Sequence, residues 1–245
     1  MPDAVFAHPR LARVYDSLDP DRSYLDTYVD LVQALSATSV LDVGCGTGTL
    51  ARRLAALGIE VLAFDPANAS VAVARTKVDA EQVEWAVATA PDVSGDWSRR
   101  ARYDLATMTA NVAQVFLEDD EWLATLRAVH SCLRPGGHLA FESRKPADRA
   151  WERWTKALTH QVVDVEAEGP VEDWTEVTAV DGEFVTFVAP KVFLADGERI
   201  VSTSMLRFRS EEALRRSLTH AGFLDVDVRD LPYAPGRGWL LLARA

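Results

Sequence analysis

An aspartate and three alternate glycines form the stretch with the clearest chemical pattern, Asp42-Val-Gly44-Cys-Gly46-Thr-Gly48. The apolar residues 40–43 that lead into it are typical of a short buried strand. Glycine has no Cβ and accepts positive φ, so the chain can turn tightly there and lie directly against a ligand. Residues 49–56 have helical spacing, which brings the free N–H groups of a helix to the same place. The stretch therefore predicts a ligand site made by a strand, a glycine loop and a helix.

Three kinds of glycine loop could account for this pattern. A phosphate-binding P-loop ends in Gly-Lys followed by Ser or Thr, and that ending is absent. A nicotinamide dinucleotide loop has Gly-x-Gly-x-x-Gly, and Thr49 stands where its last glycine belongs. What remains resembles the first motif of the class I S-adenosylmethionine-dependent methyltransferases. A glycine loop that only closes a strand-to-helix turn is the plainer alternative.

This resemblance implies S-adenosylmethionine as the cofactor, with S-adenosylhomocysteine as its product. In the family, the glycine loop packs against the methionine part, and the acidic residue before it orients the amino group. The residues that match are Asp42, Gly44, Cys45, Gly46, Gly48 and Thr49. Tyr15 matches a residue of an N-terminal helix that covers the cofactor, although packing on the core explains it equally well.

A second acidic residue, Asp65, ends the next buried strand. It follows Gly44 by about 20 positions, where this layout places a carboxylate on the ribose hydroxyls. Pro66 comes next and stiffens the turn, so we expect both residues at the cofactor. A helix N-cap at Asp65 is an alternative that is compatible with this role.

Two later strand ends supply further cofactor candidates. After the third strand the family usually has an acidic residue for adenine, and here Thr89 and Ala90 take that place. After the fourth strand, Thr109, Asn111 and Gln114 lie where the resemblance places the transferable methyl group. Asn111 is also a candidate for substrate binding, or it simply caps the turn. The Asp/Asn-Pro-Pro-aromatic signature of DNA-methylating relatives is absent.

The end of the fifth strand carries Glu142 and Arg144. Open α/β sheets bind ligands outside the carboxyl ends of their strands, so both residues are substrate-binding candidates, with an ion pair on the rim as the alternative. For proton removal from the acceptor, the catalytic candidates are Glu142 and His160, the latter on location alone. Trp154 and Trp174 suit a ring-bearing or apolar acceptor, or else they pack in the core. The five histidines are too scattered to predict a metal site.

The elements that must position these residues follow an α/β pattern. Helical spacing in residues 9–35 breaks at the Asp-Pro-Asp of 19–21 and predicts two helices. Strands are expected at 59–64, 82–87, 103–108 and 138–143, and helices at 68–77 and 122–133. A last helix from Ser210 and strands at 224–228 and 239–242 resemble the end of a seven-stranded methyltransferase sheet. We therefore expect a Rossmann-like sheet, mostly parallel with its last strand antiparallel, with helices on both faces.

The α/β alternation stops after residue 145 and resumes at residue 209. Between them, Asp-Gly turns separate expected strands at 171–180, 184–194 and 199–208, which predicts an antiparallel meander. The expected domains are thus an N-terminal helical cap (1–36), a cofactor-binding core (37–145 and 209–245) and an insertion (146–208). We expect residues 160–208 to act as a substrate lid that leaves the cofactor site independent. A dimerisation surface at an exposed strand edge is the alternative.

Composition limits the partners and the compartment. The net charge of −11 repels a phosphate backbone, so a nucleic acid substrate is not expected. The two cysteines make no disulfide framework, and no apolar run is long enough to cross a bilayer, so we expect a cytoplasmic protein. The main hypothesis is an enzyme that methylates N or O of a small molecule. A non-catalytic S-adenosylmethionine-binding module and a nicotinamide-dependent oxidoreductase are the alternatives.

Overall fold

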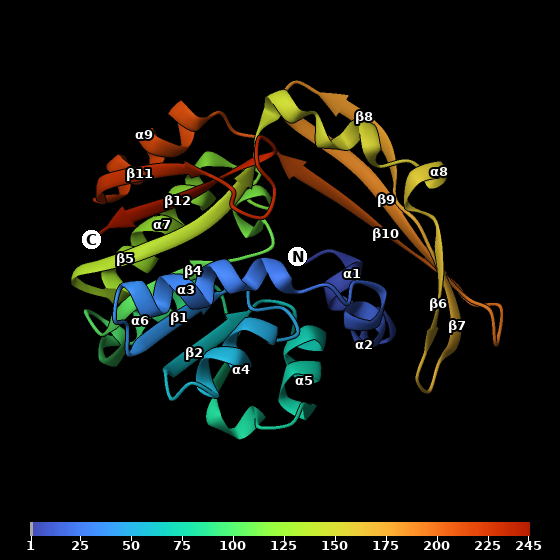
Figure 1. The fold of residues 1–245 in the computed structure, drawn as a ribbon, viewed down its shortest axis with the longest axis horizontal. Helices are drawn as coiled ribbons and strands as arrows, with labels where there is room; N and C mark the ends of the chain where they lie inside the picture. Colours follow the sequence, from blue (N-terminus) through green and yellow to red (C-terminus); the bar gives the residue numbers. More distant parts are fainter. Residues whose placement is uncertain (1) are drawn as a thin grey trace.

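A twisted seven-stranded sheet, sheet A, forms the centre of the computed structural model, which describes residues 2–245 (Figure 1). Its strands lie in the order β11-β12-β5-β4-β1-β2-β3. Their bounds are β1 (Ser39–Val43), β2 (Glu60–Asp65), β3 (Glu84–Val87), β4 (Tyr103–Met108), β5 (Leu133–Arg144), β11 (Leu224–Asp230) and β12 (Gly238–Arg244). β12 is antiparallel to both neighbours, and the other pairs are parallel. The expected mostly parallel sheet with an antiparallel last strand is confirmed.

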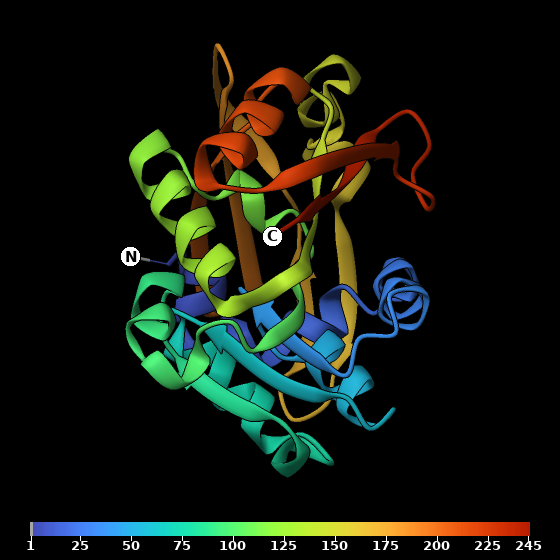
Figure 2. The same ribbon diagram turned by 90° about the vertical axis from the view of Figure 1, so that its left-hand side faces the viewer.

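Helices cover both faces of sheet A. One face packs against α3 (Asp26–Ala34) and α4 (Thr49–Ala55), and α5 (Asn68–Thr76) lies beside β2 and β3. The other face packs against α6 (Ala90–Gly95), α7 (Asp119–Cys132) and α9 (Glu211–Ala221). Figure 2 shows α7 and α9 together on that side. Because the central strands β1, β2 and β4 are buried on both faces, their side chains alternate between the two helical layers.

Short helices and 3₁₀ turns connect these elements. They are α1 (Ala4–Ala7), α2 (Pro9–Leu18), η1 (Ser23–Leu25), η2 (Ala80–Gln82), η3 (Trp97–Arg99), η4 (Val112–Gln114), η5 (Pro146–Asp148), η6 (Ala150–Arg153) and α8 (Lys156–Thr159). The two helices expected before the first strand correspond to α2 and α3, separated near the expected break. None of the helices within residues 2–245 combines the length and the apolar character needed to span a bilayer.

A second, antiparallel sheet, sheet B, is inserted between β5 and α9. Its strands are β6 (Gln161–Val165), β7 (Gly169–Asp173), β8 (Glu176–Asp181), β9 (Phe184–Phe193) and β10 (Arg199–Arg207). The expected single strand over 171–180 is wrong, because the chain breaks into β7 and β8, which pair with different halves of β9. At the break, the Thr159 hydroxyl accepts a hydrogen bond from the N–H of Thr175 at 2.9 Å and donates one to the C=O of Thr175 at 3.1 Å. β6 was not predicted, since its turn to β7 has Ala167 at positive φ in place of a glycine.

The N-terminal helix α2 packs directly on sheet B. Leu11, Val14 and Leu18 are buried against Val171 and Phe193 in one apolar cluster. The cap and the insertion therefore share an apolar cluster. In Figure 1, α2 lies between the main body and β6 to β10.

Candidate functional site

The three glycines of the loop after β1 have different surroundings. All have positive φ, which suits glycine and strains other residues. A Cβ built on Gly44 would meet Val112, and one on Gly48 would meet Trp85. A Cβ built on Gly46 would meet no atom within 4 Å. The backbone at Gly46 is therefore the part of the loop that faces open space, while Gly44 and Gly48 are required by packing.

Asp42 lies buried in β1, just before this loop. Thr107 Oγ1 of β4 donates to its Oδ1 at 2.9 Å, and its Oδ2 has no hydrogen-bond partner. Burial raises the pKa of Asp42 to about 7, and the charge of Asp65 adds to the effect. A buried carboxylate oxygen without a donor is a place where the N–H of a ligand can bind.

Asp65 at the end of β2 ties the loop to its neighbour strand. Its Oδ2 accepts from the N–H of Gly46 at 3.0 Å, and its Oδ1 accepts from the N–H of Ala67 at 2.7 Å. Burial raises the pKa of this carboxyl group. The residue flanking α5 is Ala67, so Asp65 is not the N-cap itself. Pro66 is exposed beside it.

The remaining cofactor candidates surround this edge of sheet A. Thr89 precedes α6, and its hydroxyl donates to Asp92 at 2.6 Å, while Ala90 is buried. Thr109 is buried just after β4. Cys45 is half-buried within the loop, and Thr49 is the first residue of α4.

The loop after β4 has a strained backbone. Ala110 and Asn111 both have positive φ, at 54° and 63°. This conformation turns the N–H of Asn111 to Glu142 Oε1, at 3.1 Å, and leaves its side-chain oxygen buried without a partner. Strain at non-glycine residues is most often found where a site requires it.

Glu142 is a buried carboxyl group at the end of β5, and tyrosine side chains surround it. Tyr28 of α3 donates a short hydrogen bond to it, and the Tyr233 phenol lies close enough to influence its pKa. Tyr24 packs on Tyr233, with ring centroids 5.8 Å apart. Burial raises the pKa of Glu142, and the two phenols and the N–H of Asn111 offset only part of that rise. We call Glu142, Tyr24, Tyr28 and Tyr233 the tyrosine–glutamate cluster.

Arg144 lies two residues further along β5. Its Nη1 donates to Gln114 Oε1 at 2.9 Å, and its guanidinium carbon lies 5.4 Å from the ring centre of Trp154. Burial lowers the pKa of Arg144, and the nearby charge of Glu142 compensates in part. The structure thus brings together Arg144, Gln114 and Trp154 from three separate segments.

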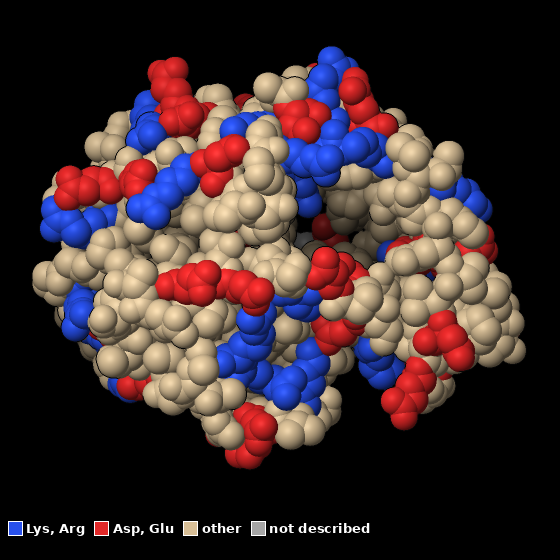
Figure 3. All heavy atoms as spheres, in the orientation of Figure 1, with Lys and Arg blue, Asp and Glu red and all other residues tan. Residues whose placement is uncertain are grey.

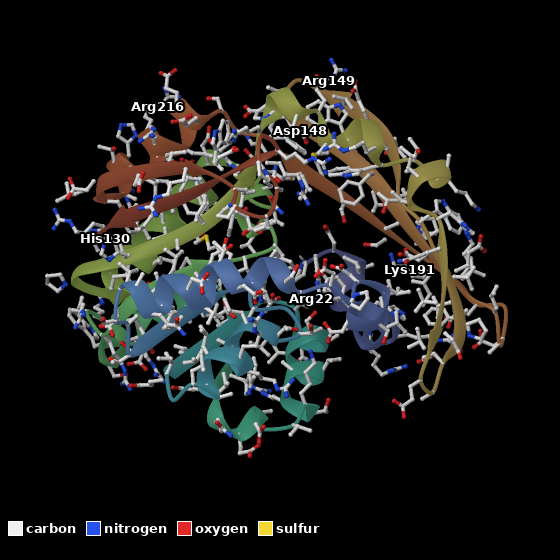
Figure 4. All side chains as sticks on the ribbon, viewed as in Figure 1. Arg22, His130, Asp148, Arg149, Lys191 and Arg216 are labelled. Atoms are coloured by element: carbon white, nitrogen blue, oxygen red, sulfur yellow. The ribbon has the colours of Figure 1, made fainter. Side chains whose placement is uncertain are left out.

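A hollow opens between the main body and sheet B (Figure 3). Basic side chains line its upper rim and acidic ones its lower rim. Figure 4 places Asp148 and Arg149, which follow β5, above this opening and Arg22 below it. Tyr15 of α2 packs on Phe6 and lies under the Arg22 guanidinium, which is 5.2 Å from its ring centre.

Two of the expected site residues, His160 and Trp174, make their contacts within the insertion. His160 Nε2 is 2.9 Å from a Glu172 carboxylate oxygen, and its ring faces Trp174. Trp174 is buried beneath Lys156, whose Nζ lies 3.7 Å from the ring centre. These contacts are all within the insertion, and the structure does not bring either residue to the tyrosine–glutamate cluster.

Sequence reasoning missed Tyr24, Tyr28 and Tyr233. The first two follow the helical spacing of core residues and gave no separate signal. Tyr233 could have been found, because it lies in the loop after β11, whose carboxyl end is at the same edge of the sheet as those of β4 and β5.

Sequence reasoning also gave no sign that Asp16 fixes the position of the glycine loop after β1. Its carboxylate accepts from the Thr47 hydroxyl at 2.7 Å and forms an ion pair with Lys77. Lys77 Nζ also donates to the C=O of Thr47 at 2.7 Å. Burial raises the pKa of Asp16, but these hydrogen bonds outweigh it and hold the pKa below its usual value. Helix α2 is therefore fastened to the glycine loop.

These features fit S-adenosylmethionine. The open backbone at Gly46 can receive the methionine part, and the unpaired Asp42 Oδ2 can accept from an ammonium group. Residues 40–137 match the family model described as a methyltransferase domain. They form a methyltransferase domain. The resemblance to the class I S-adenosylmethionine-dependent methyltransferases is thereby confirmed.

Relatives and solved structures extend this likeness. The chain is 31% identical over 124 residues to the cypemycin N-terminal methyltransferase of a Streptomyces species, covering 51% of this chain and 49% of that one. It is 36% identical over 124 residues to a ubiquinone biosynthesis O-methyltransferase of Xanthomonas campestris, covering 49% of each chain. The chain thus spans about half the length of the curated relatives it matches. The CcbJ methyltransferase of Streptomyces caelestis has the same fold, with a TM-score of 0.77 and 20% identity over 100% of this chain and 99% of that one.

Proposed function

We propose that this chain transfers a methyl group from S-adenosylmethionine to an amino group of a small molecule held in the hollow between sheet A and sheet B. The observation that carries the proposal is the tyrosine–glutamate cluster, which places a buried carboxylate and phenol groups at the ligand-binding edge of the sheet. When bound, the cofactor supplies a methyl group that is already activated by a positively charged sulfur.

In this proposal the chain first binds and orients the cofactor. The Gly46 backbone lies against its methionine part, Asp42 Oδ2 accepts from its amino group, and Asp65 accepts from its ribose hydroxyls. Asp65 can still accept hydrogen bonds from the ribose hydroxyls, because each of its oxygens accepts only one N–H in the structure and can accept a second donor. Thr89 and Ala90 remain the proposed adenine contacts, and α2 with Tyr15 covers the site.

The acceptor is proposed to be an amine because of what surrounds Glu142. One relative is named an N-terminal methyltransferase and the other an O-methyltransferase, so the names do not decide the acceptor atom. Phenol rings and a carboxylate attract a cationic amine. Such an amine must lose a proton before it can react. Glu142 is the carboxylate beside these phenols, so it is the group that would accept the proton. His160 has no comparable placement, and we do not assign it a role.

The test uses Glu142→Gln, which keeps the shape and removes the charge. We expect kcat to fall by roughly a hundredfold, the usual contribution of a general base, with S-adenosylhomocysteine affinity within twofold of wild type. Formation of S-adenosylhomocysteine from S-adenosylmethionine is measured with a panel of small amines. Full kcat in Glu142→Gln would reject the assignment. Tight cofactor binding with no turnover of any amine or alcohol would favour the non-catalytic module instead.

The remaining partners belong to the same proposal. We infer that nucleic acid is not the acceptor, because the net charge is −11. Cytoplasmic location is supported by two cysteines that remain free, Cys45 and Cys132. Association of two copies through sheet B is supported by its edge strands, β6 and β10, each of which pairs with a strand of the sheet along one edge only. Sedimentation of the full chain at several concentrations tests that last point.

A further inference from the structure

We propose that the acceptor carries a carboxylate and that Arg144 binds it, so that the substrate class is small amino carboxylates. This inference rests on the proposed function. It adds Arg144 to Glu142 as a second group that binds the acceptor at the same site. It is carried by a half-buried guanidinium that has no anionic partner within residues 2–245.

The charge of Arg144 is not neutralised by a direct contact. Its one hydrogen bond within residues 2–245 is to the neutral amide oxygen of Gln114. Glu142 and Asp148 act on it only through their charge at a distance, without a hydrogen bond. The Glu142 oxygens accept from the Tyr28 hydroxyl and the N–H of Asn111, and each keeps a further lone pair for a ligand. A cation that is partly withdrawn from water without an anionic partner is costly, which is why such groups are usually found with an anion.

The free N–H groups of Arg144 are accessible to a ligand. Arg207 and Arg209 each have side-chain nitrogen atoms that are both unpartnered and sealed from solvent. Arg144 has no such atom, although most of its N–H groups lack a partner among residues 2–245. Its free nitrogens are therefore not sealed from solvent, and a ligand can reach them.

The shape of the free edge selects a planar anion. Trp154 lies against the guanidinium, and Gln114 occupies Nη1. What remains is an edge of parallel N–H groups, which matches a carboxylate in the two-point arrangement. Glu142 and Arg144 are two residues apart on one strand and on the same side, so they are about 7 Å apart along it. An amine at Glu142 and a carboxylate at Arg144 therefore belong to one small molecule.

The test compares matched ligands on the complex with S-adenosylhomocysteine. The probes are glycine, β-alanine, proline and 4-aminobenzoate, each paired with its carboxamide, together with phosphoethanolamine as a phosphate-bearing amine. Binding is measured by calorimetry to wild type, Arg144→Gln and Lys145→Gln. The last variant removes one positive charge from the adjacent residue, whose Nζ pairs with Asp230 at 2.5 Å.

We expect at least one carboxylate to bind wild type tenfold or more tightly than its carboxamide. Arg144→Gln should abolish that preference and Lys145→Gln should keep it, with S-adenosylhomocysteine affinity within twofold in both. Equal binding of carboxylates and carboxamides, preference for phosphoethanolamine alone, or no binding of any carboxylate to wild type would each overturn the proposal. Failure of wild type to bind S-adenosylhomocysteine would instead reject the proposed function itself.

Discussion

The glycines of the loop after β1 make different demands on a substitution, and one pair of variants separates them. A methyl group on Gly46 meets no atom, so Gly46→Ala should cost only the strain of positive φ, about 1–2 kcal/mol. It should nevertheless weaken S-adenosylhomocysteine binding strongly, because the methyl group occupies the ligand's place. In Gly48→Ala, the new Cβ would stand 2.3 Å from Trp85 Cη2, so the fold should lose about 2–5 kcal/mol.

Thermal unfolding and calorimetry measure the two effects separately. A folded Gly46→Ala protein with wild-type affinity would show that the ligand does not touch this backbone. The two glycines make a matched pair because both have positive φ. They differ in the space available to a Cβ, which is open at Gly46 and filled by Trp85 at Gly48.

Asp42 gives the cofactor site a pH dependence whose sign can be worked out. With a pKa of about 7, the carboxyl group is partly protonated at neutral pH when no ligand is bound. An ammonium group at Oδ2 would lower that pKa, so binding should release a proton near pH 7 and affinity should rise between pH 6 and pH 8. Calorimetry of S-adenosylhomocysteine in buffers of different ionisation enthalpy measures the released proton.

Asp42→Asn is the control for this effect. It keeps the size of the side chain but cannot titrate, so proton release should disappear and the affinity should become nearly constant over the same range. Equal proton release in the variant and in wild type would assign the effect to another group, with Asp65 the first candidate because its pKa is also raised by burial.

At the scale of elements, helix α2 is held by one face to the glycine loop and by another to sheet B. Asp16→Asn or Lys77→Met should break the first link and weaken S-adenosylhomocysteine binding by roughly tenfold, since a hydrogen bond to a charged group is worth about 1.5–3 kcal/mol. Arg13→Gln, on the same helix, removes an exposed pair with Glu168 and should change affinity by less than twofold. Unchanged affinity in both first variants would mean that the loop keeps its shape without α2.

The sequence predicted the elements of sheet A well, because glycine loops and buried apolar runs mark them locally. It predicted sheet B less well. The break between β7 and β8 is made by Thr159, which lies 16 residues before Thr175, and such a partner leaves no local pattern.

The candidate site shows the same division. Asp42, Gly46 and Asp65 could be found from their spacing along the chain. The tyrosine–glutamate cluster joins Tyr28, Glu142 and Tyr233, which are far apart in sequence, and the lack of an ion-pair partner for Arg144 depends on what Gln114 and Trp154 do around it.

At the scale of the whole molecule, replacing residues 171–205 by a short Gly/Ser linker tests how far sheet B supports the rest. The deletion would expose Leu11, Val14 and Leu18, and full exposure of an aliphatic side chain costs about 1.5–3 kcal/mol. We therefore expect a lower melting temperature and weaker S-adenosylhomocysteine binding, as well as loss of methyl transfer. A folded deletion protein with wild-type affinity would show that α2 keeps its position alone, as the sequence had suggested.

The position of α2 also limits how such a chain can be recombined with its relatives. The chain leaves sheet A after Arg144 to form sheet B, whose last residue is Arg207. Gln114 contacts both ends: it accepts from the Arg144 guanidinium and donates to the C=O of Arg207 at 3.5 Å. The two crossing points are thus neighbours, which makes the insertion look like a segment that could be exchanged to give a new acceptor range. Yet Arg10 of α2 pairs with Glu168, Asp196 and Glu198 on the turns of sheet B. A chimaera that took sheet B from another protein would need residues 4–18 from the same donor, so the exchangeable unit consists of two pieces from distant parts of the gene.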